Sequence, residues 1–358
     1  MIHLGEGLVT ARRACGLTQA QLAEAAGVTQ AALSRYESDL REPDADVLAR
    51  MAAALGVTVP LLTSMDRLHG ALAVDVHMRR RATAKATDWR RLEARLNLYR
   101  ARAGKMLEEL SIRTEQRVPT FDPIDTDPRH AAMMVRMQWR MPIGPVRRLI
   151  QWLESAGCLV ISEDFDTSRV DGLSQWINDC PVILINSRAP VDRLRLTLAH
   201  ELGHLSLHSN EVSDDVEAEA NRFASEFLMP TEVIKPQLRN LTVAKLLDLK
   251  REWGASMQAL AERAYELDVI SADQRTNLYK SLSAKGWRTR EPVSDELPPE
   301  TPELPQNIGE ALRSRGMSSD EIAEFAGFSR ENMSHPFRPQ PPALRSSGTR
   351  HLRSVNAG

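Results

Sequence analysis

The sequence contains few cysteines, and those it has lie far apart. Cys15, Cys158 and Cys180 are the only three in 358 residues, and no two of them form a CxxC pair. An odd number of isolated cysteines is not the pattern of a disulfide framework or of a cysteine-rich zinc site. We therefore expect these residues to be small buried side chains.

Long apolar runs are also missing. No segment approaches the roughly 18 to 20 consecutive apolar residues that a membrane-spanning helix needs. The first residues, MIHLGEGLVTARR, lack the basic and then apolar pattern of a secretion signal. We expect a cytoplasmic protein that does not contact a membrane.

The chain is long enough for two or three folded domains, and 42% of its residues are hydrophobic. Residues 5–65 are typical of short helices separated by glycine-centred turns. Two short apolar runs, CLVIS at 158–162 and PVILINS at 181–187, predict strands of a small sheet. We interpret PVILINS as an edge strand against which an extended peptide could bind.

The overall charge of −2 averages over unequal segments. Residues 1–65 hold five basic and seven acidic residues, whereas residues 66–119 hold thirteen and seven. Any electrostatic attraction for nucleic acid would therefore centre on the second segment. This segment predicts a helical connector with one buried stripe, formed by Leu92, Leu96, Tyr99 and Met106.

The strongest chemical motif is the HExxH sequence formed by His200, Glu201 and His204. On a helix, two residues four apart are about 40° apart around the axis and roughly 6 Å apart along it, so both imidazoles can reach one zinc ion. Glu201 is next to a ligand without being one, and it can take a proton from zinc-activated water. The leucines around the motif predict a largely buried helix, in which unpaired His and Glu side chains would be costly.

A catalytic zinc needs a third protein ligand. His208 lies about 12 Å along the helix from His200, so both could bind one ion only if the helix were strained. A carboxylate from the next predicted helix fits better. We expect Glu217, with Glu219 as the reserve, and Asn221 on the same face as Glu217 as a second-shell amide.

RLRLTLAHELGHLSLH at 193–208, followed by EAEANRFASEFLMP at 217–230, resembles the ImmA/IrrE family of metallopeptidases. The resemblance covers roughly residues 75–290. It implies a zincin-like domain in which His200, His204 and Glu217 bind zinc and Glu201 is the general base. It also implies proteolysis of a helix-turn-helix repressor. Arg195 and His208 are candidates for stabilising the oxyanion, although both residue types are more often structural.

LTQAQLAEAAGVTQAALSRYES, within residues 6–62, resembles the Cro/C1-type (XRE) helix-turn-helix family. Thr18 and Thr29 are expected to cap the second and third helices, and Gly27 supplies the turn between them. The residues expected to contact DNA are Gln30, Ala31 and Arg35 at base edges, Gln19 and Ser34 at phosphates, and Thr29 at the helix start. Because this segment is acidic, DNA affinity could depend on dimerisation or on the Arg-rich stretch 79–102. A protein-binding module on the same scaffold is the alternative.

An internal repeat aligns residues 16–34 with residues 316–334 without gaps. Both copies predict a helix, a glycine turn and a second helix, although any amphipathic hairpin of this kind could align as well. The segment before the second copy, EPVSDELPPETPELP, is rich in proline and acidic residues and is typical of an unstructured linker.

Together these patterns predict a mainly α fold with a small β-sheet (α+β), in which an all-α helix-turn-helix domain precedes a zincin-like metallopeptidase domain. The expected divisions are 1–66, a Cro/C1-type helix-turn-helix domain; 67–125, a basic helical connector and loop; 126–290, the metallopeptidase domain; 291–306, the linker; 307–336, a helix-turn-helix-like hairpin; and 337–358, a disordered tail.

The function predicted from these domains is zinc-dependent (Zn2+) endopeptidase activity that controls transcription. The expected partners are double-stranded DNA, a protein substrate of the repressor type and, as an open alternative, a second copy of the chain. The alternative functions are a transcriptional regulator whose metal domain senses or binds without turnover, and an antitoxin-like protein.

Overall fold

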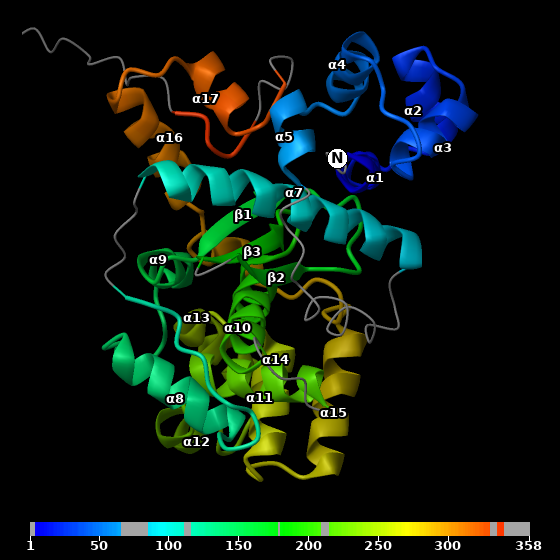
Figure 1. Cartoon of the computed structure of the whole chain (residues 1–358). Coiled ribbons are helices and arrows are strands. Elements are labelled where there is room, and N and C mark those ends of the chain that lie inside the picture. Colours follow the sequence, from blue (N-terminus) through cyan, green and yellow to red (C-terminus); the bar gives the residue numbers. More distant parts are fainter. Residues whose placement is uncertain are drawn as a thin grey trace, which may run out of the picture.

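The computed structural model describes residues 4–65, 85–110, 116–177, 180–208, 215–329 and 335–339. It is mostly helical with one three-stranded sheet, which confirms the predicted α+β class. The sheet lies at the centre, beneath the long helix α7 (Ala86–Leu110). The N-terminal helices and the last two helices of the chain lie on one side of α7, and the large domain lies on the other (Figure 1). Among the described residues, no helix combines the length and the apolar composition needed to cross a bilayer.

The N-terminal domain consists of five short helices around one apolar core. They are α1 (Gly5–Ala14), α2 (Gln19–Ala26), α3 (Gln30–Glu37), α4 (Ala45–Ala54) and α5 (Val59–Ser64). The predicted caps are present: the Thr18 hydroxyl accepts from the Gln21 N–H and the Thr29 hydroxyl accepts from the Ala32 N–H. Gly27 ends α2 with a φ of +66°, a left-handed conformation that favours glycine.

The sheet has the order β1-β3-β2, with β1 and β3 parallel and β2 and β3 antiparallel. The strands are β1 (Leu159–Glu163), β2 (Gly172–Ile177) and β3 (Cys180–Asn186). The prediction that PVILINS is an edge strand is wrong, because β3 pairs on both sides. β2 was not predicted, because its GLSQWI sequence mixes polar with apolar residues and forms no apolar run.

The two faces of the sheet belong to different cores. Val160, Ile183 and Ile185 point towards α10 (Val191–Leu207), which carries the HExxH motif. The opposite face packs under α7 through Leu92, Leu96, Tyr99 and Met106, which is the stripe predicted from their spacing. The other helices of the large domain are α8 (Pro128–Gln138), α9 (Leu149–Ser155), α11 (Val216–Leu228), α12 (Thr231–Gln237), α13 (Val243–Trp253), α14 (Met257–Glu266) and α15 (Ala272–Ala284).

The arginines of α7 contact the segments packed around it, and Arg95 joins the two domains. Arg95 donates to the Ala14 carbonyl in the N-terminal domain at 3.2 Å and to the Asp164 carbonyl after β1 at 2.8 Å. Arg91 donates to the Phe165 carbonyl at 2.7 Å, and Arg102 is buried over the ring of Phe328. Arg91, Arg95 and Arg102 are therefore engaged within the protein, whereas Arg90 is exposed. The predicted role of this stretch in attracting DNA stays a prediction. Residues 79–84 lie outside the described part of the chain.

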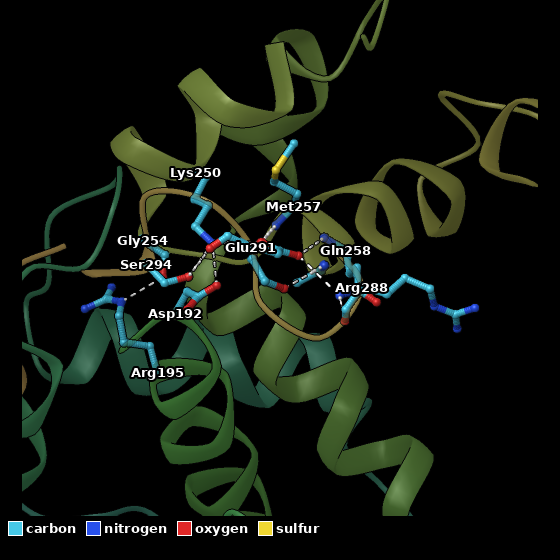
Figure 2. A network of polar contacts seen from close by, with 11 residues as sticks. Asp192, Arg195, Lys250, Gly254, Met257, Gln258, Arg288, Glu291 and Ser294 are labelled. Atoms are coloured by element: carbon cyan, nitrogen blue, oxygen red, sulfur yellow. Dashed lines mark hydrogen bonds and ion pairs between the residues drawn. The ribbon is translucent and has the colours of Figure 1, made fainter. Parts of the chain in front are cut away.

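The residues predicted to form an unstructured linker, 291–306, pack against the large domain. Glu291 accepts from the buried Lys250 ammonium at 2.7 Å and from the Met257 N–H at the start of α14 at 2.7 Å (Figure 2). A short 3-10 helix, η2 (Ser294–Glu296), follows, and its Ser294 also binds Lys250. Composition suggested disorder here, but Glu291 and Glu300 are fixed by the buried cations Lys250 and Arg195, which are distant in sequence.

The C-terminal hairpin, α16 (Leu304–Ser314) and α17 (Ser319–Phe325), repeats the local structure of α1 and α2. Ser318 and Glu321 form a capping box like that of Thr18 and Gln21. The second helix predicted for this copy falls on residues 330–334, outside the described residues, as does the tail from 340. Within the predicted disordered tail, Phe337 is instead fully buried against the core under α7.

Candidate metal centre

Two imidazoles converge on the buried side of α10. His200 and His204 are one helical turn apart, and their Nε2 atoms are 3.0 Å from each other. Both side chains are at most 7% exposed. Gly203 between them lets α11 approach closely, since a Cβ there would lie 3.2 Å from Phe223 and from Ala220. The motif is therefore positioned by the packing of α10 against α11.

Glu217, in the first turn of α11, completes the group. Its carboxylate oxygens lie 3.5 Å from the Nε2 of His200 and 3.4 Å from that of His204. The three ligand atoms all fall within 4.8 Å of one another. Burial disfavours ionisation of Glu217, but the hydrogen bonds to the two imidazoles outweigh it and hold its pKa well below the usual range. Two imidazole nitrogens and one carboxylate oxygen are a donor set that fits catalytic zinc.

Each imidazole has a second polar contact behind it. His200 Nδ1 lies 2.9 Å from Asn221 Oδ1, so the amide oxygen contacts this ring on the side away from Glu217. His204 Nδ1 lies 3.1 Å from His208 Nδ1, and His208 Nε2 lies 2.8 Å from Glu219 Oε2. Glu219, the reserve ligand, is thus directed towards His208 and is not part of the three-residue group. Burial lowers the pKa of His208, and its bond to Glu219 opposes that shift.

Glu201 is held from the other side by β2. The Ser174 hydroxyl donates to Glu201 Oε2 at 2.7 Å. The approach of the strand depends on Gly172, because a Cβ there would lie 2.5 Å from Thr197 Cγ2 and 3.3 Å from Glu201 Cγ. Ser174 was not predicted as a site residue, because β2 was not predicted and no motif in the sequence distinguishes this serine from the others.

The two candidates for oxyanion stabilisation have other partners. Arg195 donates to the carbonyls of Val146 and Gly254 and pairs with the buried Glu300, so it joins three segments of the large domain. His208 lies between His204 and Glu219. These contacts give both residues structural roles.

The residues predicted to contact DNA do not share one environment. Gln30, Ala31 and Arg35 are exposed together on α3. Thr29 caps that helix, and Ser34 is half-buried beside them. Gln19, predicted to contact a phosphate, instead donates to Glu37 at 2.8 Å. Arg12 also binds Glu37, so the site of Gln19 is a local polar network within the domain.

Two parts of the chain match family models of known proteins. Residues 8–62 match the helix-turn-helix family, and residues 153–265 match the peptidase family described as the IrrE N-terminal-like domain. The second match includes all three residues of the candidate metal group. The HTH-type transcriptional regulator ImmR of Bacillus subtilis (strain 168) is 35% identical over 67 residues, which are 19% of this chain and 53% of that protein. The chain thus spans about half the length of the curated relative that it matches.

Proposed function

We propose that this chain, which joins a helix-turn-helix domain to an IrrE N-terminal-like domain, is a zinc-dependent metalloendopeptidase that cleaves a repressor or another regulator of transcription. The observation that carries the proposal is the convergence of His200, His204 and Glu217, next to Glu201 on the same helix. An endopeptidase of this kind would act in the cytoplasm, close to DNA bound by α3.

The residues of the site divide the chemistry between them. His200, His204 and Glu217 would hold the zinc, which when bound acts as a Lewis acid that acidifies water and polarises a peptide carbonyl. Glu201 would accept the proton of the attacking water and pass it to the leaving amine. Ser174 holds one oxygen of this carboxylate at 2.7 Å, so it fixes the orientation of the general base.

The substrate would bind along β2, the outer strand beside Glu201. In the described part of the chain β2 pairs only with β3, so its other edge can accept an extended peptide through backbone hydrogen bonds. This replaces β3, the strand assigned to that role from sequence. Because backbone contacts carry little side-chain information, we expect selectivity to depend on bringing the substrate to the site.

The helix-turn-helix domain would bring the substrate to the site. Its exposed Gln30, Ala31 and Arg35 are suited to the major groove, where glutamine pairs with adenine and arginine with guanine. A peptidase fixed beside a DNA-reading helix would meet regulators that bind neighbouring sites. The named function of the matched relative, a transcriptional regulator, supports a role in transcription.

A second candidate is a transcriptional regulator whose metal domain binds or senses without cleaving. The same relative supports it, because its printed name states regulation and no proteolysis. Against it, a structural zinc more usually has four protein ligands of the Cys and His type, and the group in the described residues has three.

Incubating the zinc-loaded chain with helix-turn-helix repressors encoded beside its gene, and identifying fragments by mass spectrometry, tests the proposal. We expect about one zinc per chain and cleavage that is lost in Glu201→Gln while folding and zinc content are kept. Equal cleavage by that variant would refute the assignment of the base. Tight operator binding with no cleavage of any such repressor would favour the second candidate.

A further inference from the structure

Two further side chains, those of His208 and Glu219, extend the polar contacts of the His204 imidazole. Neither belongs to the candidate metal group. Its Nδ1 meets His208 Nδ1 at 3.1 Å, and His208 Nε2 meets Glu219 Oε2 at 2.8 Å. His208 is fully buried, and the Glu219 side chain is 15% exposed. Glu217, Glu219 and Asn221 all lie in the first turns of α11, so this helix supplies a ligand and a partner for each imidazole.

When a metal is bound, only one arrangement of protons satisfies the contacts among His204, His208 and Glu219. The Nε2 of His204 must keep its lone pair free, so its proton lies on Nδ1 and is donated to His208. The Nδ1 of His208 must then accept, which places its own proton on Nε2. That proton is donated to Oε2 of the Glu219 carboxylate, which accepts it. Both hydrogen bonds therefore have the same direction: His204 donates to His208, and His208 donates to Glu219.

We infer that His208 and Glu219 are a positioning pair that fixes the tautomer and orientation of His204 and thereby sets the affinity of the site for zinc. The inference rests on the proposed function, since it assumes that the site holds the metal. Asn221 performs the same task for His200 through one contact, whereas His204 needs the pair because its Nδ1 faces His208. Groups of this kind change metal affinity by about 10- to 100-fold when they are removed.

The direct test measures the zinc affinity of the full chain by competition with a chromophoric chelator. His208→Leu removes the acceptor and should weaken zinc binding about 10- to 100-fold. His208→Gln should lose less, because its amide can accept from His204 and donate to Glu219. Glu219→Gln keeps an acceptor without the charge, so its zinc affinity should also lie between those of the native chain and His208→Leu. The matched control is Glu232→Gln on the exposed face of α12, which should bind zinc like the native chain.

A second readout separates positioning from general stability. Cobalt(II) in place of zinc reports the ligand geometry by its visible absorption, and thermal unfolding of the metal-free chain reports the fold. Altered cobalt absorption in His208→Leu, with partial return in His208→Gln, supports positioning. If His208→Leu does not fold, His208→Gln and Glu219→Gln decide the question.

Native zinc affinity and cobalt absorption in both His208→Gln and Glu219→Gln, with any effect confined to metal-free stability, would overturn the inference while leaving the proposed function intact. Failure of the unaltered chain to bind zinc would instead remove the proposed function, and the inference with it.

Discussion

Gly327, in the turn after α17, lies directly against Leu61 of α5. A Cβ at position 327 would be 2.8 Å from Leu61 Cδ2, and the glycine has a φ of +77°. On either side of this contact, the Thr58 N–H donates to the Gly327 carbonyl and the Ser329 N–H donates to the Gly56 carbonyl. The C-terminal hairpin therefore packs against the N-terminal domain through an interface that requires glycine.

Replacing Gly327 should loosen this interface. Gly327→Ala adds a clash with Leu61 to the strain of a left-handed backbone, and we expect a loss of about 2–3 kcal/mol in the free energy of unfolding. Gly316→Ala is the matched control, because Gly316 has a φ of +97° but no atom near its absent Cβ. That variant should lose about 1 kcal/mol. Denaturant unfolding measures both, and equal losses would show that the contact with Leu61 does not limit packing.

The buried Lys250 makes the strongest prediction about stability. Its ammonium binds Asp192 and Glu291 at 2.7 Å each, and all three side chains are nearly inaccessible (Figure 2). Lys250→Met leaves two buried carboxylates without their cation, which should cost about 3–5 kcal/mol.

The neighbouring Arg251→Met is the control for Lys250→Met, since Arg251 is 49% exposed and pairs only at the surface, with Asp248 at 3.6 Å and Glu296 at 3.8 Å. Arg251→Met should lower the free energy of unfolding by no more than about 0.5 kcal/mol. A similar small effect in Lys250→Met would contradict the structural role given to residues 291–296.

Glu154 gives stability a predictable pH dependence. Burial raises its pKa from 4.5 to about 7, although the N–H groups of Leu304 and Glu303 partly oppose the shift. Because the folded chain holds this proton more tightly than the unfolded chain, the contribution to stability is full below about pH 4.5 and is lost as pH rises through about 7.

Glu154→Gln cannot ionise, so its melting temperature relative to the native chain should rise between pH 5 and pH 8. The expected gain is about 1–2 kcal/mol after allowance for the remaining solvent exposure. Thermal unfolding across that pH range measures the difference. A difference that stays constant with pH would show that Glu154 titrates normally.

The convergence of His200, His204 and Glu217 could be predicted because these residues follow the helical period. His200 and His204 are four apart, and Glu217 and Asn221 repeat that spacing on the next helix. Ser174 could not be predicted in the same way, because its contact with Glu201 depends on a strand that has no apolar run. The packing of Glu291 was also hidden, since its partners Lys250 and Met257 are 34 or more residues away and composition alone suggested a linker.

Arg35 and Arg95 have different roles in the proposed function, which a pair of variants can separate. Arg35 is exposed on α3, whereas Arg95 donates to the carbonyls of Ala14 and Asp164 and so joins the domains. Arg35→Ala should weaken specific DNA binding by about 1–3 kcal/mol and relax the preference at one base pair. Arg95→Ala should leave DNA affinity unchanged and lower the melting temperature, because it removes contacts within the protein. Selection of bound sequences from a random DNA pool, followed by binding assays at fixed salt, measures the first effect. If Arg95→Ala weakened DNA binding as much as Arg35→Ala, α7 would belong to the DNA-binding surface, and the assignment of base reading to α3 alone would have to be abandoned.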